Sequence, residues 1–258
     1  MCIRDRNNFL PVFWLASEDH DFEEISEVYF RDKKINYLTK SKGSVGRMKL
    51  DDFSAFLDEI FKFFHTNNLA KRIKKIITSA YKDKSTLASA TRSLIHQLFG
   101  DKGLIIIDPD SHNLKKIFAS YMEDELINNT CEKFVNKTIK SIKEVYSEKY
   151  TPQVNPREIN LFHLNVNSRE RIIRKGSKYI LSDKNLSQKE MLNELNKRPE
   201  NFSPNVLMRP LFQEVILPNL CYIGGPSEMS YWLQLKSFFD YHGVVFPIIN
   251  PRVSVLLI

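Results

Sequence analysis

Short apolar runs alternate along the chain with segments of helical periodicity. Residues 11–16 (PVFWLA) and 103–107 (GLIII) are almost entirely apolar and end at polar residues, which is typical of strands buried on both faces of a parallel sheet. Between them, apolar side chains recur at helical spacing over residues 51–65, 69–81 and 86–99. This alternation predicts an α/β fold with a Rossmann-like, doubly wound core.

The second half of the chain continues the alternation. Residues 114–150 predict one long helix, and residues 220–223 predict a strand that ends in Gly-Gly-Pro. A helix over residues 227–241 and strands over residues 244–249 and 253–258 follow. Ligands bind at the carboxyl ends of such strands in open α/β sheets, so we expect residues 17–24 and 224–228 to surround a common pocket.

The domain organisation predicted from these segments is a partial Rossmann-like core over residues 7–258. Segments inserted into this core are expected near residues 31–80 and 114–200, the first including a hairpin that turns at residues 32–34. Residues 1–6 (MCIRDR) lack the apolar stretch of a signal peptide, and we expect them to be a non-native artefact. Because the chain stops within a predicted strand, we expect it to be an internal piece of a longer protein.

Composition and charge narrow the functional classes. The 258 residues are 42% hydrophobic and 27% charged, with 8 Gly and 11 Pro, which excludes low-complexity and collagen-like classes. The longest apolar runs fall well short of the roughly 18 residues that a membrane span needs, so no membrane partner is expected. The net charge of +7 comes from lysines interspersed with glutamates, which favours solvated helix faces and attraction of a small anion over nucleic-acid binding. Three scattered cysteines indicate no disulfide framework and favour a reducing cytoplasm.

The densest group of ionisable residues follows the first predicted strand. Ser17 is a plausible N-cap, and the acidic residues suit the first turn of a helix. His20 between carboxylates is suited to general base catalysis near neutral pH, although an acidic helix start with a structural histidine explains the same pattern. Asp-His-Asp could ligate Mg²⁺ or Mn²⁺, but histidine–aspartate phosphohydrolases need another histidine before this pair and none precedes His20. No resident metal is therefore predicted. The acidic residues are Glu18, Asp19, Asp21, Glu23 and Glu24.

Two more polar clusters follow predicted strands. The first is Asp108-Pro109-Asp110, and the second is the Gly224–Glu228 turn, whose glycine amides and following helix suit a phosphate or carboxylate. Arg209 could bind a carboxylate bidentately, although a surface salt bridge is an equal alternative. Tyr231 and Trp232 could line a site there, or simply pack in the core.

Four longer segments carry a resemblance to a known family. They are PVFWLASEDHDFEEI, TLASATRSLIHQLFGDKGLIIIDPD, YTPQVNPREINLF and SPNVLMRPLFQEVILPNLCYIGGPSEMSYWLQLKSFFDYHGVVFPIINPR. In this order they closely resemble the BshC family, the cysteine-adding enzymes of bacillithiol biosynthesis. The resemblance runs from about residue 9 to residue 258 and is looser over residues 31–80.

The resemblance implies a cytoplasmic ligase that couples cysteine to glucosaminyl-malate, with ATP as the activating cofactor and Mg²⁺ as a possible companion. It also implies a nucleotide-binding strand before residue 9 and a dimerising coiled coil after Arg252, both outside this chain. Without them, inactivity or poor folding of the isolated fragment is an expected risk. His20, oriented by Asp19 or Asp21, would be the base that frees the amine. The substrate-binding candidates are Ser17, Glu18, Glu23, Arg209, Gln213, Gly224, Gly225, Pro226, Glu228, Tyr231 and Trp232.

Two other classes stay open on the residues alone. One is a non-catalytic α/β module that binds an anion or RNA, which salt-dependent RNA retention would support. The other is a metal-dependent hydrolase that uses the acidic cluster, which metal-dependent phosphatase activity would support.

Overall fold

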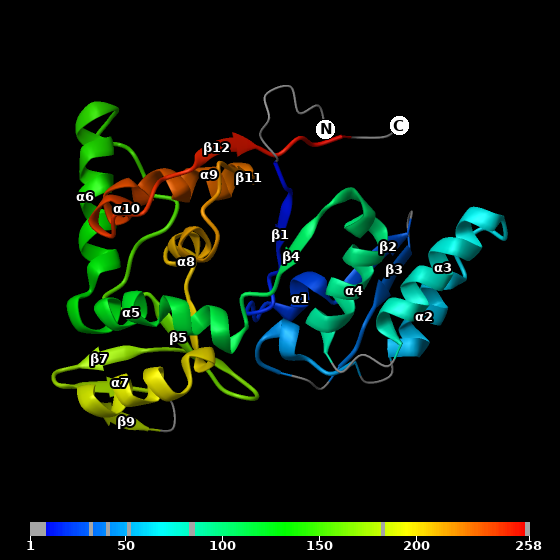
Figure 1. Cartoon of the computed structure of the whole chain (residues 1–258), viewed down its shortest axis with the longest axis horizontal. Helices are drawn as coiled ribbons and strands as arrows, with labels where there is room; N and C mark the ends of the chain where they lie inside the picture. The colour runs from blue at the N-terminus through cyan, green and yellow to red at the C-terminus, as the bar shows by residue number, and fades with distance from the viewer. Residues whose placement is uncertain are drawn as a thin grey trace. The chain divides into compact units, whose positions relative to one another are not determined.

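The computed structural model describes residues 9–30, 33–39, 42–50, 53–82, 86–181 and 184–255 (Figure 1). The predicted artefact, residues 1–6, lies outside the described residues. The chain forms two compact units, the first from Met1–Ser111 with Asn165–Arg169 and the second from His112–Leu164 with Glu170–Ile258. The predicted insertions into a single core are not tested by this division and stay a prediction.

A two-stranded parallel sheet lies at the centre of the first unit. Its strands pair in register from Val12 opposite Ile105 to Trp14 opposite Ile107, as the two apolar runs predict. The elements of this unit are β1 (Val12–Trp14), α1 (Phe22–Ile25), β2 (Glu27–Phe30), β3 (Lys33–Asn36), a 3-10 helix (Val45–Arg47), α2 (Phe53–Phe61), α3 (Asn68–Tyr81), α4 (Leu87–Phe99), a 3-10 helix (Gly100–Lys102) and β4 (Ile105–Ile107).

The prediction that these two strands are buried on both faces is wrong for the described residues. Phe13 is 41% exposed and Ile105 is 40% exposed. Only β1 and β4 pair in this sheet within the described part of the chain, so each strand keeps an unpaired edge and an incompletely covered face.

The helices and the hairpin of the first unit follow the sequence pattern closely. Strands β2 and β3 pair antiparallel, with Lys33 and Lys34 in the second strand and not in the turn. Helix α4 begins with a capping box, in which Thr86 and Ser89 exchange hydrogen bonds between side chain and backbone. The apolar stripe of α2 packs as predicted, since Phe53 stacks on the ring of Tyr81 at 4.5 Å between centroids.

The second unit begins with two helices where one was predicted. Helices α5 (His112–Asn128) and α6 (Thr130–Val145) replace the single helix expected over residues 114–150. The break lies at Asn129, whose φ of 54° is left-handed, a conformation that asparagine tolerates better than most residues. Buried Glu125 accepts the backbone N–H of Cys131 at 2.8 Å and so caps the second helix.

The rest of the second unit combines short strands with helices. Two three-stranded sheets have the orders β10-β5-β6 and β7-β8-β9, and β11 and β12 pair in parallel. The elements are β5 (Leu161–Leu164), β6 (Arg169–Arg171, whose first residue belongs to the first unit), β7 (Ile173–Lys175), β8 (Lys178–Ile180), β9 (Asn185–Ser187), α7 (Gln188–Lys197), a 3-10 helix (Pro199–Asn201), β10 (Phe202–Pro204), α8 (Arg209–Ile216), β11 (Cys221–Gly224), α9 (Pro226–Trp232), a 3-10 helix (Leu233–Leu235), α10 (Lys236–Tyr241) and β12 (Ile248–Pro251).

Aromatic side chains fill the core of this unit. Trp232, Phe238 and Phe239 are fully buried. The helix predicted over residues 227–241 is interrupted by a 3-10 turn. The strand predicted over residues 244–249 begins only at Ile248 and ends at Pro251. Residues 253–255, the described part of the last predicted strand, are not in a strand. Within the described residues, no helix has the length and apolarity to cross a membrane.

Candidate functional site

The acidic segment, residues 17–24, lies beside the end of β4. Ser17 is 2% exposed, and its hydroxyl donates a hydrogen bond to Oδ1 of Asp108 at 2.5 Å. Because β1 and β4 are parallel, their carboxyl ends lie at the same edge of the sheet and bring these two residues together. Two of the three polar clusters predicted at strand ends are therefore neighbours in the first unit.

The 3-10 helix before α2 (Val45–Arg47) holds the backbone of the acidic segment. The N–H of Val45 donates to the carbonyl of Asp19 at 2.7 Å, and the N–H of Gly46 donates to the carbonyl of Ser17 at 2.9 Å. A Cβ at Gly46 would lie 2.4 Å from the Cβ of Ser17, so the two chains approach at a distance that only glycine permits. The prediction of Ser17 as an N-cap is wrong, because α1 starts only after Asp21.

His20 lies between two carboxylates. Its Nδ1 is 3.6 Å from Oδ1 of Asp19, and its Nε2 is 3.7 Å from Oδ1 of Asp21. The side chain of His20 is 46% exposed, which leaves the ring accessible from solvent. Each ring nitrogen of His20 therefore faces one carboxylate oxygen.

Arg169 joins this cluster, and the sequence analysis missed it. Its Nη1 lies 3.4 Å from Nδ1 of His20, although 149 residues separate the two along the chain. Burial lowers the pKa of Arg169, while the charges of Glu18, Asp19 and Asp21 act in the opposite sense. The arginine therefore offsets part of the negative charge of the acidic segment. No local pattern could have placed a residue so distant in sequence.

The ring nitrogens and carboxylates of the acidic segment have a geometry that fits a divalent cation. One ligand atom from each of Asp19, His20 and Asp21 lies within 4.8 Å of the others, and all three side chains are exposed. Exposed acidic groups are common without a metal, so the prediction of no resident metal stays a prediction. Glu18 is largely buried, unlike its three neighbours.

A cavity of about 650 Å³ opens beside the acidic segment. It places the imidazole and three carboxylates against Lys42. Its lining residues are His20, Asp21, Phe22, Glu23, Glu24, Lys42, Gly43 and Met48.

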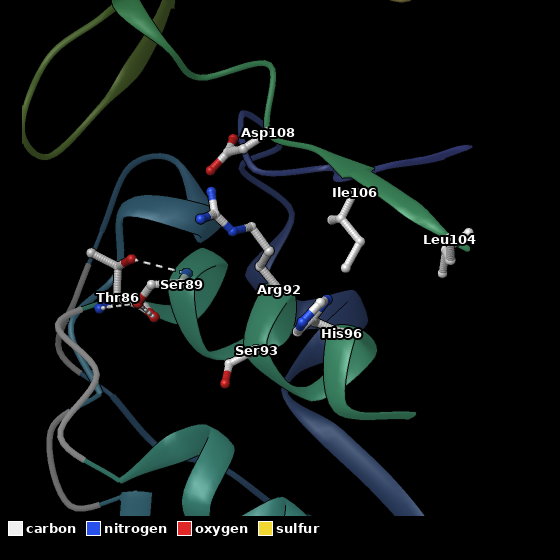
Figure 2. Close-up of a pocket in the computed structure, with 8 residues that line it drawn as sticks. All are labelled: Thr86, Ser89, Arg92, Ser93, His96, Leu104, Ile106 and Asp108. Atoms are coloured by element: carbon white, nitrogen blue, oxygen red, sulfur yellow. Dashed lines mark hydrogen bonds between the residues drawn. The ribbon is translucent and has the colours of Figure 1, made fainter. Parts of the chain in front are cut away.

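A second cavity of about 700 Å³ lies between α4 and β4, and the sequence analysis did not find it. Figure 2 shows the guanidinium of Arg92 pointing toward Asp108, with the ring of His96 beside Ile106. The signal was present in the sequence, since Ser89, Arg92, Ser93 and His96 recur at the spacing of one helix face. The lining residues are Thr86, Ser89, Arg92, Ser93, His96, Leu104, Ile106 and Asp108.

The predicted anion site of the second unit is a closed hydrogen-bond network. Arg209 donates from Nη2 to the hydroxyl of Tyr231 at 2.5 Å, and the same nitrogen lies 3.8 Å from Oε1 of Glu228. Tyr222, which the sequence analysis missed, donates to Oε1 of Glu228 at 2.5 Å. Burial raises the pKa of Tyr222 to about 12, so this hydroxyl stays protonated and donating at neutral pH.

The remaining candidates of this unit have structural partners. The N–H of Gly225 donates to Oε2 of Glu228 at 2.8 Å, and Pro226 opens α9 as predicted for a first helical turn. Trp232 is fully buried and stacks on Tyr222 at 4.4 Å between centroids, and Nε2 of Gln213 donates to Glu214. Core packing thus accounts for Trp232. The predicted approach of residues 224–228 to residues 17–24, which belong to different units, stays a prediction.

Comparisons with known proteins agree on one family. The model of "Bacillithiol biosynthesis BshC, N-terminal Rossmann-like domain" matches residues 4–253. A protein of Flavobacterium johnsoniae is 48% identical over 252 residues, covering 97% of this chain and 47% of its own length. A protein of Christiangramia forsetii is 41% identical over 261 residues, and one of Bacillus cytotoxicus is 30% identical over 260 residues. Both alignments cover at least 95% of this chain and 47–48% of the relative. All three are named "Putative cysteine ligase BshC". The chain spans about half the length of the curated relatives it matches.

Proposed function

The chain belongs to the BshC family and is part of its Rossmann-like domain, and from this membership we propose that the complete protein is a cytoplasmic ligase that adds cysteine to glucosaminyl-malate. The observation that carries the proposal is the family match across residues 4–253. The relatives are named as cysteine ligases, which supports the reaction class. The free thiols of Cys131 and Cys221 are consistent with a reducing compartment.

The proposed reaction has two chemical demands. Forming an amide from a carboxylate and an amine in water is unfavourable, so the carboxyl group of cysteine needs activation, which ATP would supply when bound. The sugar amine is mostly protonated near neutral pH, so a base has to remove a proton before the nitrogen can attack. We propose that His20 is this base, with Asp19 and Asp21 orienting its ring.

The geometry of the acidic segment supports this role. Carboxylates lie 3.6 and 3.7 Å from the two ring nitrogens of His20, and the cavity beside the ring also contains Glu23. An ammonium group entering this cavity would meet carboxylate oxygens and then an imidazole able to take its proton. Asp21 and Glu23, which line this cavity, are therefore proposed to hold the sugar amine, with Ser17 fixing the start of the segment on Asp108. A substrate contact of Glu18, which does not line the cavity, stays a prediction.

Arg209 is proposed to bind a malate carboxylate or a phosphate. Its Nη2 is bound to Tyr231, so the other guanidinium N–H groups would have to reach the ligand. The backbone N–H of Gly225 already donates to Glu228 and so is not available to an anion. The proposed anion site therefore depends on Arg209 more than on the glycine N–H groups.

ATP and Mg²⁺ remain proposals for the complete protein. Asp19 and Asp21 offer the oxygen ligands that Mg²⁺ prefers, and their ligand atoms are close enough to share one ion with His20. An ion bound there would have as a ligand the same imidazole of His20 that is proposed as the base. Activity as a function of Mg²⁺ concentration in the His20→Ala protein would separate the two roles. The proposed homodimer would form through the part of the complete protein that lies outside this chain.

The experiment uses the full-length protein with cysteine, glucosaminyl-malate and ATP, and detects the cysteinyl product by mass spectrometry. We expect His20→Ala to lower kcat by about 10²–10⁴-fold, the usual contribution of a general base. His65→Ala is the matched control, since His65 is exposed and lines neither cavity of the first unit. Absence of product from the wild-type protein would refute the ligase, and an unchanged rate in His20→Ala would refute the base assignment alone.

A further inference from the structure

The cavity between α4 and β4 carries one positive and one negative side chain that do not neutralise each other. Among the described residues, the guanidinium of Arg92 has no hydrogen-bond or ion-pair partner, and Figure 2 shows it pointing across the cavity toward Asp108. The carboxylate of Asp108 accepts Ser17 and the N–H of Asp110 on Oδ1, at 2.5 and 3.1 Å. Within the described chain its Oδ2 accepts no hydrogen bond, so each wall offers unused capacity to a ligand.

This arrangement discriminates between classes of ligand. A phosphate or a dicarboxylate would form an ion pair with the guanidinium of Arg92 but would be repelled by the carboxylate of Asp108. A simple amine would pair with Asp108 but would be repelled by Arg92. A zwitterion satisfies both walls at once, because an arginine fork binds a carboxylate bidentately and a carboxylate oxygen accepts from an ammonium group. Leu104 and Ile106 supply an apolar wall for a small side chain.

The position of the cavity suits a substrate. It extends along β4 from Leu104 to Asp108, and Asp108 follows the carboxyl end of this parallel strand, where α/β folds bind their ligands. Its volume of about 700 Å³ exceeds what one amino acid fills. The Ser17 hydroxyl on Asp108 joins this wall to the segment that carries His20 three residues later. An amino acid held here would leave space for a second reactant.

We propose that this cavity binds the amino-acid substrate as a zwitterion, with Arg92 on the α-carboxylate and Asp108 on the α-ammonium group. The inference rests on the proposed function, in which that amino acid is cysteine. Thr86 and Ser89 are already engaged in the capping box of α4. Ser93, which also lines the cavity and accepts from Gln97, is the hydroxyl that remains able to donate to the ligand.

The test measures binding to the full-length protein by isothermal titration calorimetry under reducing conditions. The ligands are L-cysteine, cysteamine, which lacks the carboxylate, and 3-mercaptopropionate, which lacks the ammonium group. We expect L-cysteine to bind wild-type protein at least about tenfold more tightly than either analogue, as loss of one charged contact costs about 1.4 kcal/mol or more.

Two variants test which side chain binds which charged group of the ligand. Arg92→Gln should weaken L-cysteine at least about tenfold and leave cysteamine unchanged, whereas Asp108→Asn should weaken L-cysteine and leave 3-mercaptopropionate unchanged. Asparagine keeps an Oδ1 acceptor for Ser17, which preserves the local fold. Arg72→Gln, an exposed arginine on α3 with the same change of charge, should bind as the wild type does.

The outcomes separate this inference from the ligase proposal. A wild-type protein that makes the cysteinyl product while Arg92→Gln keeps its KM for cysteine overturns the zwitterion site and leaves the ligase standing. If the protein shows the expected binding pattern but yields no cysteinyl product, the proposed ligase activity is refuted and the proposed zwitterion site is retained. Failure of L-cysteine to bind the wild-type protein at all overturns the inference directly.

Discussion

The hydroxyl of Ser17 donates to Oδ1 of Asp108 at 2.5 Å, across 91 residues of sequence. This bond ties the segment that follows β1 to the residue that follows β4. One of its partners begins the acidic segment and the other forms a wall of the α4–β4 cavity. The relationship makes the local fold and the proposed chemistry depend on the same pair of side chains.

Ser17→Ala should destabilise the protein by about 1–3 kcal/mol, because it removes a buried donor from a charged acceptor. Urea denaturation of wild type and variant measures the change. Ser26→Ala is the matched control, since the Ser26 hydroxyl donates to Glu23 at an exposed position. Equal losses in the two variants would contradict a special role for the Ser17 bond.

Gly46→Ala should destabilise the protein and disturb the acidic segment. The new Cβ would lie 2.4 Å from the Cβ of Ser17 and 2.5 Å from its carbonyl oxygen, which is closer than real Cβ contacts. Since backbone atoms of Ser17 contribute to the clash, adding Ser17→Gly should not restore stability. Rescue in the double variant, measured by thermal unfolding, would show that only the serine side chain is in the way.

Patterns local in sequence predicted most of the fold. Helix α3 was expected over residues 69–81 and runs from Asn68 to Tyr81. Helix α4 was expected over residues 86–99 and runs from Leu87 to Phe99, after a capping box at Thr86. Helical periodicity and capping residues act within one or two turns, so the sequence alone displays them. The break at Asn129 was missed because its cause is partly tertiary. The side chain of Asn129 donates to the carbonyl of Glu158 and accepts from Arg174.

The candidate site was predictable only where strand ends carry polar residues. Ser17 and Asp108 each follow an apolar run, so the rule for parallel sheets pointed to their neighbourhood. Arg169 reaches His20 from a distant strand, and Tyr222 was read as part of a strand with no chemical role. Such contacts depend on how the elements pack, which periodicity does not encode.

Arg47 should be hard to replace, even by lysine. Its Nε and Nη2 donate to the two oxygens of Asp110, each at 2.6 Å, and the side chain of Asp110 is only 8% exposed. Lysine keeps the charge but not the fork, so Arg47→Lys should cost about 1 kcal/mol and Arg47→Ala about 2–3 kcal/mol of unfolding free energy.

Urea denaturation of the two Arg47 variants tests this order, with Lys62→Ala as the control. Lys62, the residue after α2, pairs with Glu59 at an exposed position, where ion pairs contribute little. An Arg47→Lys protein as stable as the wild type would show that charge alone, without the bidentate geometry, holds Asp110.

Glu125 should make stability fall as the pH rises. The side chain is fully buried, and burial raises its pKa above the ordinary 4.5 although the hydrogen bonds that it accepts act in the opposite sense. The folded state therefore binds the proton more tightly than the unfolded chain. The contribution of Glu125 is present in full below pH 4.5 and is lost as the pH rises through the folded-state pKa.

Glu125→Gln isolates this effect. The side chain of glutamine has one acceptor oxygen where the carboxylate has two. Its NH2 group would therefore face the N–H of either Cys131 or Asn160, which now donate to Glu125 at 2.8 and 2.9 Å. The variant should be less stable by about 1–3 kcal/mol in acid, and the difference from wild type should shrink toward neutral pH, because only the wild type titrates there. Urea denaturation across this pH range measures the difference. Glu144→Gln, at an exposed position of α6, should show no such trend. A difference that grows with pH would place the folded-state pKa of Glu125 below its ordinary value.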